Sequence, residues 1–192
     1  MVVSERGGQT VTDDYFDEGE FLLEDAFASA YLRRLRAAAR TWVTDVQPSQ
    51  TSVETMNDPI AVSIRVPGVS GPVTTLWVLC RPRSDRAPWL HGSWGDRAYV
   101  GDDYGVDPDR DLTVEGLELG PEALADLAAQ WLEAQLLMEI HRDEWAGTRW
   151  GRRDILGPTP YPSVRARWGA PRRSVLERRD GFAAPRERSW SV

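Results

Sequence analysis

The chain of 192 residues contains no lysine, since all 23 of its basic residues are arginine. Chemistry that needs a lysine amine, such as a Schiff base or the phosphate contact of a P-loop, is therefore excluded. Any contact with a phosphate or a carboxylate must use the planar guanidinium group of arginine. Together with the many Ala, Gly and Pro residues, this lysine-free composition indicates a GC-rich coding sequence, as in high-GC bacteria.

Cysteine and long apolar runs are also scarce. The single Cys80 cannot form an internal disulfide, and its place in the apolar run 74–80 predicts a buried strand thiol. No run approaches the length of a membrane span, and the N-terminus has no cationic start followed by an apolar stretch. We expect a cytoplasmic protein without membrane contact. No cofactor motif occurs, so we expect no cofactor.

The two ends of the chain differ in charge. Residues 1–141 contain 11 Arg against 24 Asp and Glu, whereas residues 142–192 contain 12 Arg against 6. The chain is therefore an acidic body with a basic tail, which predicts either a partner or docking of the tail on the body. Nine Trp residues supply aromatic anchors for a core or for a binding surface.

Hydrophobic periodicity predicts two long helices. Apolar residues recur at steps of three and four over residues 17–46 and again over 120–145, where Pro121 stands at the first helical position. The second pattern places His141 on one apolar stripe with Met138. We therefore expect His141 to be a packed helix histidine.

Between the helices the period of the apolar residues changes to two. Residues 60–66 alternate as a half-buried strand does, and 73–80 read as a more fully buried one. Residues 89–100 form a third strand, or two short strands joined by a tight turn, and 111–119 favour an edge strand. Residues 47–58 read as a polar linker.

This order predicts an α+β two-layer domain, in which an antiparallel β meander of three to five strands is flanked by an N-terminal and a C-terminal helix on one face. We assign residues 1–16 to a mobile N-terminal segment, 17–145 to the globular domain, and 146–192 to an extended Arg/Pro/Gly-rich C-terminal tail. Only residues 172–179 of the tail have the composition of a short helix. The tail either wraps the body or stays mobile.

The tail contains the first candidate site. The triplet Arg-Trp-Gly occurs at 149–151 and again at 167–169, each time followed by further arginines. Arginine beside an aromatic ring can bind carboxylates of a protein surface, or hold a phosphate while the ring stacks on a base. Docking on the acidic body, binding of another protein and binding of nucleic acid are the three interpretations, in that order. The candidate partner-binding residues are Arg149, Trp150, Arg152, Arg153, Arg167, Trp168, Arg172 and Arg173.

The histidines and the acidic residues give weaker candidates. His91 lies close in sequence to Trp94 and Asp96, in a region that we interpret as a structural hairpin rather than a catalytic site.

Residues 107–118 have acidic residues spaced like the ligands of a calcium-binding loop. The sixth position is Leu112, where such a loop needs a glycine with positive φ. We therefore expect no metal and interpret the segment as a surface loop. The residues of this weak candidate are Asp107, Asp109, Asp111 and Glu118.

No catalytic constellation emerges from these residues. A helix, a meander and a helix form the architecture of secretion chaperones, toxin-neutralising immunity proteins and adaptors, which is an analogy of fold alone. The first hypothesis is a non-enzymatic protein-binding module of adaptor, chaperone-like or immunity type, from a high-GC bacterium or its phage. The alternative is a nucleic-acid-associated protein acting through the tail, and the last is a small enzyme with His91 in a cleft.

Overall fold

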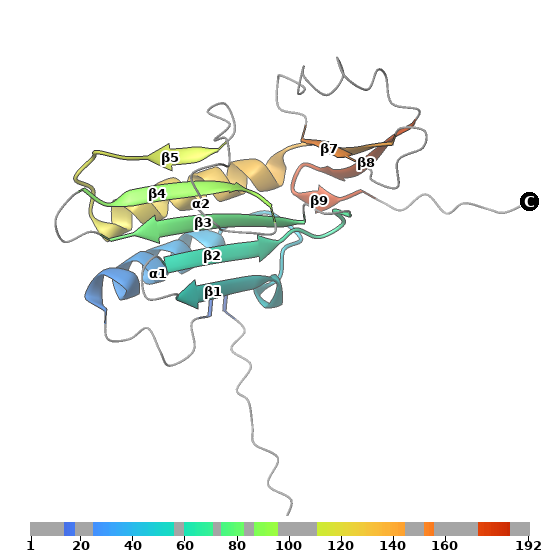
Figure 1. Ribbon diagram of the computed structural model, residues 1–192. Coiled ribbons are helices and arrows are strands. Elements are labelled where there is room, and N and C mark those ends of the chain that lie inside the picture. The colour runs from blue at the N-terminus through green and yellow to red at the C-terminus, as the bar shows by residue number, and fades with distance from the viewer. Residues whose placement is uncertain are drawn as a thin grey trace, which may run out of the picture.

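The fold consists of two helices and two antiparallel sheets (Figure 1). A computed structural model of the chain is the basis of this description. It describes residues 14–17, 25–55, 60–70, 74–82, 87–95, 111–144, 152–155 and 173–184.

The elements follow one another in a simple order. The first part contains α1 (Ala26–Ala39), the short 3-10 helix η2 (Pro48–Gln50), β1 (Thr51–Thr55), β2 (Ile60–Arg65), β3 (Thr75–Arg81), β4 (Trp89–Trp94) and β5 (Leu112–Val114). The second part contains α2 (Pro121–Leu137), β6 (Ile140–Glu144), β7 (Arg152–Ile155), β8 (Arg173–Arg179) and β9 (Phe182–Ala183).

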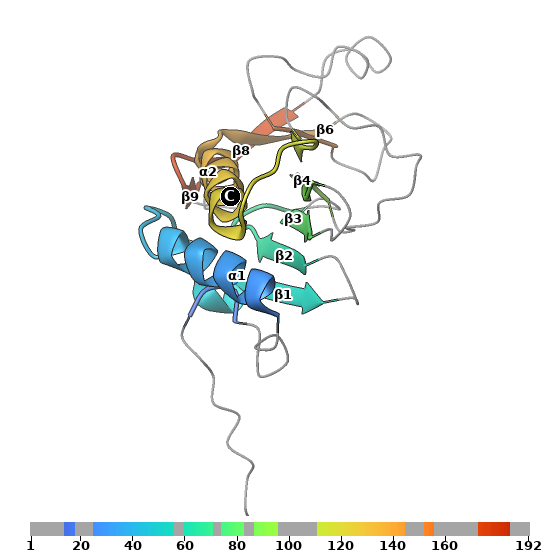
Figure 2. The same ribbon diagram turned by 90° about the vertical axis from the view of Figure 1, so that its left-hand side faces the viewer.

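The first sheet is a five-stranded meander in chain order, β1-β2-β3-β4-β5, with every neighbouring pair antiparallel. Both helices lie on the same face of it, as the view along the strands shows (Figure 2). The predicted α+β fold with an antiparallel meander and two helices is therefore confirmed. A second sheet, in the order β7-β6-β8-β9, was not predicted.

The polar linker predicted at residues 47–58 is wrong for Thr51–Thr55, which form β1 and pair with β2. Only Val53 of this strand is apolar and packed against the core. An edge strand with so little apolar character has a weak pattern, and its pairing with β2 decides its conformation.

The first helix is shorter than predicted. Asp25 caps it, because its Oδ1 accepts hydrogen bonds from the backbone N–H groups of Phe27 and Ala28, at 2.8 and 3.3 Å. The helix ends at Ala39, so the prediction that it extends to residue 46 is wrong. Trp42 is nevertheless buried, against Tyr15 and the buried Phe16. Residues 15 and 16, assigned above to the mobile N-terminal segment, thus contact the domain.

The second helix begins at Pro121, as predicted, but ends at Leu137 rather than near residue 145. Met138 already has an extended backbone, with ψ 146°, and β6 follows at once. The prediction of a helical position for His141 is wrong, since His141 lies in β6. Pairing of β6 with β7 and β8 overrides the helical periodicity of this segment.

The core lies between the first sheet and the helices. Leu76, Val78 and Leu90 of the sheet are fully buried, as are Leu124 and Leu132 of α2. Cys80 is buried in β3, as predicted. Of the helices in the described part of the chain, none is long and apolar enough to cross a membrane.

The second sheet includes a tight hairpin between β8 and β9. Asp180 and Gly181 form its two-residue turn, and both have positive φ, 53° and 89°. Two positive φ values are the signature of a type I′ turn, for which the Asp-Gly sequence is favoured. The short helix predicted over 172–179 is therefore wrong, because residues 173–179 form a strand.

Candidate functional site

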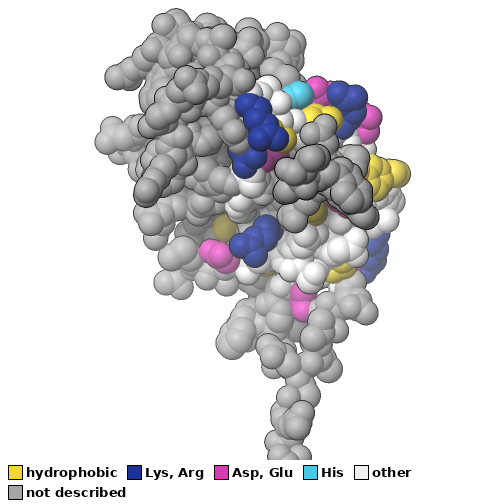
Figure 3. Space-filling model, turned by 90° about the vertical axis from the view of Figure 1, so that its right-hand side faces the viewer, with side chains coloured by type: hydrophobic (Ala, Val, Ile, Leu, Met, Phe, Trp, Pro, Cys, Tyr) yellow, Lys and Arg dark blue, Asp and Glu magenta, His cyan; other side chains and the backbone are white. Residues whose placement is uncertain are grey.

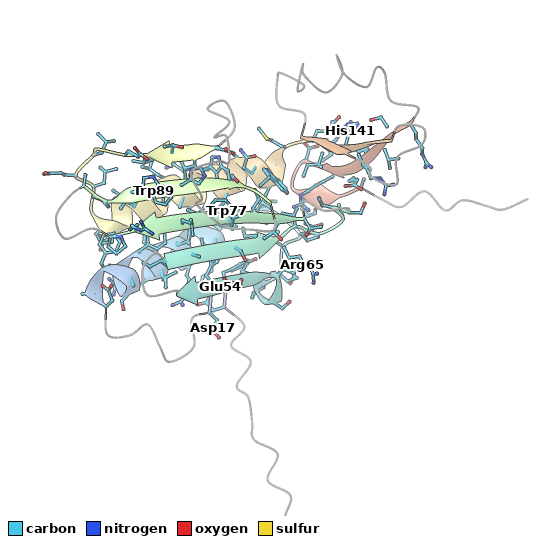
Figure 4. All side chains as sticks on the ribbon, in the orientation of Figure 1. Asp17, Glu54, Arg65, Trp77, Trp89 and His141 are labelled. Atoms are coloured by element: carbon cyan, nitrogen blue, oxygen red, sulfur yellow. The ribbon has the colours of Figure 1, made fainter. Side chains whose placement is uncertain are left out.

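His91 lies on the face of the first sheet that points away from the helices. Its imidazole stacks on the indole of Trp89, with ring centroids 5.5 Å apart and an interplanar angle of 11°, and packs 5.3 Å from the ring of Trp77. Figure 4 labels Trp77 and Trp89 on this sheet. Trp94 lies on the opposite face, where its Nε1 donates to Gln135 of α2 at 2.9 Å. The structure thus does not bring His91 and Trp94 together, and Asp96 lies outside the described residues.

The environment of His91 favours a neutral ring. Burial between the indoles lowers the pKa of His91, although the carboxylates of Asp111 and Glu115 oppose the shift. The hydroxyl of Thr113 lies 3.4 Å from its Nδ1, and Trp89 Nε1 donates to Glu115 at 2.7 Å. These contacts make His91 part of an aromatic stack on the sheet and give no support to an acid–base role.

The weak metal candidate is only partly covered by the structure. Leu112 begins the extended strand β5, so the tight turn of a calcium-binding loop is not formed at that position. Within the described ranges no group of three or more His, Cys, Asp or Glu side chains is placed to hold a metal. Asp111 and Glu118 belong to these ranges, whereas Asp107 and Asp109 lie outside them.

The arginines of the predicted tail fall into two sets. In β7, Arg152 lies opposite Asp143 of β6 and Arg153 lies opposite Arg142. Arg173 begins β8 and lies opposite Glu144 of β6. The second sheet therefore gathers these three candidates, and Arg173 is exposed. The candidates that lie outside the described residues are Arg149, Trp150, Arg167, Trp168 and Arg172.

The most tightly held residue of this region is Arg178, which was not a candidate. Its side chain is fully buried and donates to Asp45 Oδ1 at 2.7 Å and to Thr44 Oγ1 at 2.8 Å. It also donates to the backbone carbonyl groups of Leu136, Pro67 and Gly181. Burial lowers the pKa of Arg178 and the Asp45 carboxylate opposes that shift, so the guanidinium is paired inside the protein.

A second polar contact anchors the same strand. The buried Glu177 accepts hydrogen bonds from the backbone N–H of Ser70, at 3.1 Å, and from its hydroxyl. Arg142 of β6 donates to the Ser70 hydroxyl at 3.2 Å and lies 3.7 Å from Glu177. These hydrogen bonds and charges hold β8 on the loop between β2 and β3.

The hairpin turn carries an apolar surface. Val43, Leu137 and Phe182 are 72%, 45% and 47% exposed, and they belong to three segments far apart in the sequence. Gly181, which precedes Phe182, lies against the other two segments, since a Cβ atom on it would lie 2.7 Å from the carbonyl oxygen of Val43 and 3.2 Å from Leu137 Cδ2. We call Val43, Leu137 and Phe182 the hairpin surface.

Charged groups border the hairpin surface. Arg179, which pairs with Phe182 across the hairpin, donates from Nε to Glu139 at 2.7 Å. The hydrogen bonds from His141 and Arg179 lower the pKa of the Glu139 carboxyl group. Figure 3 views this end of the molecule and shows positive and negative side chains beside apolar ones. Exposed apolar residues with charged neighbours are typical of a binding surface.

No protein-family model, no curated protein and no solved structure matches this chain.

Proposed function

We propose that this chain is a protein-binding module and that the hairpin surface is its contact site. Single exposed apolar residues are normal on any protein, but contiguous ones mark sites of interaction. The observation that carries the proposal is the position of Gly181, which precedes the exposed Phe182 and lies against the segments of the exposed Val43 and Leu137.

The hairpin that presents Phe182 is firmly held. The hydrogen bonds of Arg178 join it to the segment after α1 and to the end of α2, and Ala183 donates its backbone N–H to Asp45 at 2.8 Å. A residue whose backbone is fixed before binding loses less conformational entropy when a partner arrives. Phe182 therefore suits the role of an anchor residue.

The charges of the rim favour a protein over a nucleic acid at this surface. Glu139 and Asp180 border it, and carboxylates repel a phosphate backbone. The partner that fits is a protein segment with an aromatic or aliphatic side chain for the apolar patch and polar groups for Arg179 and Glu139. Nucleic-acid binding through the tail arginines remains the alternative outcome of the experiment.

The test is quantitative capture of a partner from lysate by purified wild-type protein, Phe182→Ser and Leu117→Ser, with captured protein and captured nucleic acid measured separately. Leu117 is a matched control, because it is also an exposed apolar residue but lies in the loop before α2. Loss of a central anchor weakens binding by about 2 kcal/mol, or about 30-fold. We expect Phe182→Ser to lose a captured protein that Leu117→Ser retains. Equal capture by all three proteins, or capture of nucleic acid alone, contradicts the proposal.

A further inference from the structure

Four polar side chains form a continuous chain on the second sheet. The Ser174 Oγ lies 3.3 Å from His141 Nδ1, and His141 Nε2 lies 2.5 Å from Glu139 Oε1. The other oxygen of Glu139 accepts from Arg179 Nε at 2.7 Å. Pairing of β6 with β8 brings these residues together although His141 and Ser174 are 33 positions apart. Figure 4 labels His141 on this sheet, well away from Trp77 and Trp89.

The chain of contacts fixes the tautomer of the histidine. Arg179 and His141 both stabilise the ionised form of Glu139, and an ionised carboxylate can only accept hydrogen bonds. A neutral His141 must then carry its proton on Nε2, facing Glu139. Its Nδ1 then has a lone pair and accepts a hydrogen bond from the Ser174 hydroxyl.

We propose that Ser174 is a nucleophile, activated by His141 as general base, and that it reacts with activated acyl or phosphonyl esters. Glu139 and Arg179 act through His141 as positioning residues. A hydroxyl, a base and a carboxylate that orients the base are the groups that nucleophilic catalysis at serine requires. A distance of 3.3 Å is compatible with this role, because such contacts shorten when substrate binds.

Accessibility agrees with this assignment. Ser174 is exposed, so an ester in solution can reach its oxygen. The His141 side chain is only 19% exposed, which shelters the base from water on most sides. Ser63 offers a contrast, because its hydroxyl lies 2.7 Å from that of Ser52. That contact involves two hydroxyls and no base, and Ser63 is therefore a matched control.

The reaction needs only the ester, water and the side chains described above. The Ser174 oxygen forms a bond to the carbonyl carbon of the ester while its proton moves to His141 Nδ1, and the Glu139 carboxylate stabilises the imidazolium. The carbon–oxygen bond to the leaving alcohol then breaks, and the alcohol takes the proton from Nδ1. Water attacks the Ser174 ester in the same way, which releases a carboxylic acid and restores the serine.

The experiment is labelling of the full chain with a fluorophosphonate, followed by mass spectrometry of the modified peptide. We expect phosphonylation at Ser174 with loss of fluoride, no labelling of Ser174→Ala, and unchanged labelling of Ser63→Ala. His141→Gln should slow labelling by about 100-fold or more, the usual contribution of a general base. Circular dichroism checks that each variant is folded. Absence of labelling in the folded wild type, or labelling at a different serine, refutes the proposal.

Two substitutions of Glu139 separate a positioning role from a structural one. Glu139→Gln removes the charge that stabilises the imidazolium and should lower the labelling rate, whereas Glu139→Asp keeps a carboxylate and should restore part of that rate. Equal labelling rates in the two folded variants would show that Glu139 only supports the sheet. Leu117→Ser, an exposed residue in the loop before α2 and outside both proposed sites, should label normally.

Discussion

The two sheets of this protein are held in place by different forces. The five-stranded sheet buries apolar side chains against two helices, with Leu76, Val78 and Leu90 fully buried. The second sheet contributes Ile140 of β6 to the same core and is otherwise attached through a buried arginine and a buried glutamate, Arg178 and Glu177. Apolar burial is non-directional and tolerates adjustment, whereas a buried charge needs its partners at fixed positions. Small changes should therefore detach the second sheet more readily than they unfold the first.

Replacement of Arg178 by Ala should produce the largest difference in stability between the two sheets. The variant leaves the half-buried Asp45 carboxylate and several carbonyl groups without their donor, and loss of one partner of a buried ion pair costs about 3–5 kcal/mol. Hydrogen exchange should show the amides of 173–184 losing protection while those of β2 and β3 keep it. Arg179→Ala, which removes an exposed ion pair, should cost less than about 1 kcal/mol. Uniform loss of protection in both sheets would mean that they form one cooperative unit.

A pair of glycines sharpens the contrast at the junction of the two sheets. Gly68 and Gly116 have nearly the same φ, 75° and 71°. A Cβ atom on Gly68 would overlap the side chain of Ala183 in β9, whereas one on Gly116 meets nothing within 4 Å.

Gly116→Ala should therefore cost only the strain of a left-handed residue, about 1–2 kcal/mol, in a urea-unfolding measurement. Gly68→Ala should cost about 1–3 kcal/mol more, because β9 must move. Equal values for the two variants would show that β9 is not packed on the turn after β2.

The smallest expected effect concerns pH and the first sheet. Burial lowers the pKa of His91 in the folded state below its unfolded value of about 6.5. Its contribution to stability is thus complete above about pH 6.5 and is lost as the pH falls through the lower folded value. His91→Phe keeps an aromatic ring between the indoles and removes the titration, so its free energy of unfolding should vary less over this window. If the free energy of unfolding of His91→Phe varied with pH as that of the wild type does, groups other than His91 would cause the pH dependence.

The same difference in forces explains which elements the sequence predicts. Strands β2 and β3 follow regular apolar patterns, and Pro121 marks the start of α2. Strands β6 and β8 are rich in charged residues that ordinarily lie on a solvated surface, and here Glu177 and Arg178 are buried. The Asp180–Gly181 pair was the local signal for the missed hairpin, because that dipeptide favours type I′ turns.

The candidate sites could be predicted from the sequence only where local pattern determines which side chains lie together. The prediction grouped His91 with Trp94, but residues three apart in a strand point to opposite faces. The contact of His141 with Ser174 depends on the pairing of β6 with β8, which nothing local to either residue indicates. A site whose residues come from different strands can be predicted only when the pairing of those strands is known.

The hydrogen bonds of Arg178 also imply an order of assembly. Its acceptors outside the hairpin belong to the segment after α1, the loop after β2 and the last turn of α2, which span residues 44–136. These acceptors come together only when the helices have packed on the first sheet. The C-terminal hairpin can therefore make all of these contacts only on a molecule whose helices and first sheet are already in place, and Phe182 takes up its position for a partner only there.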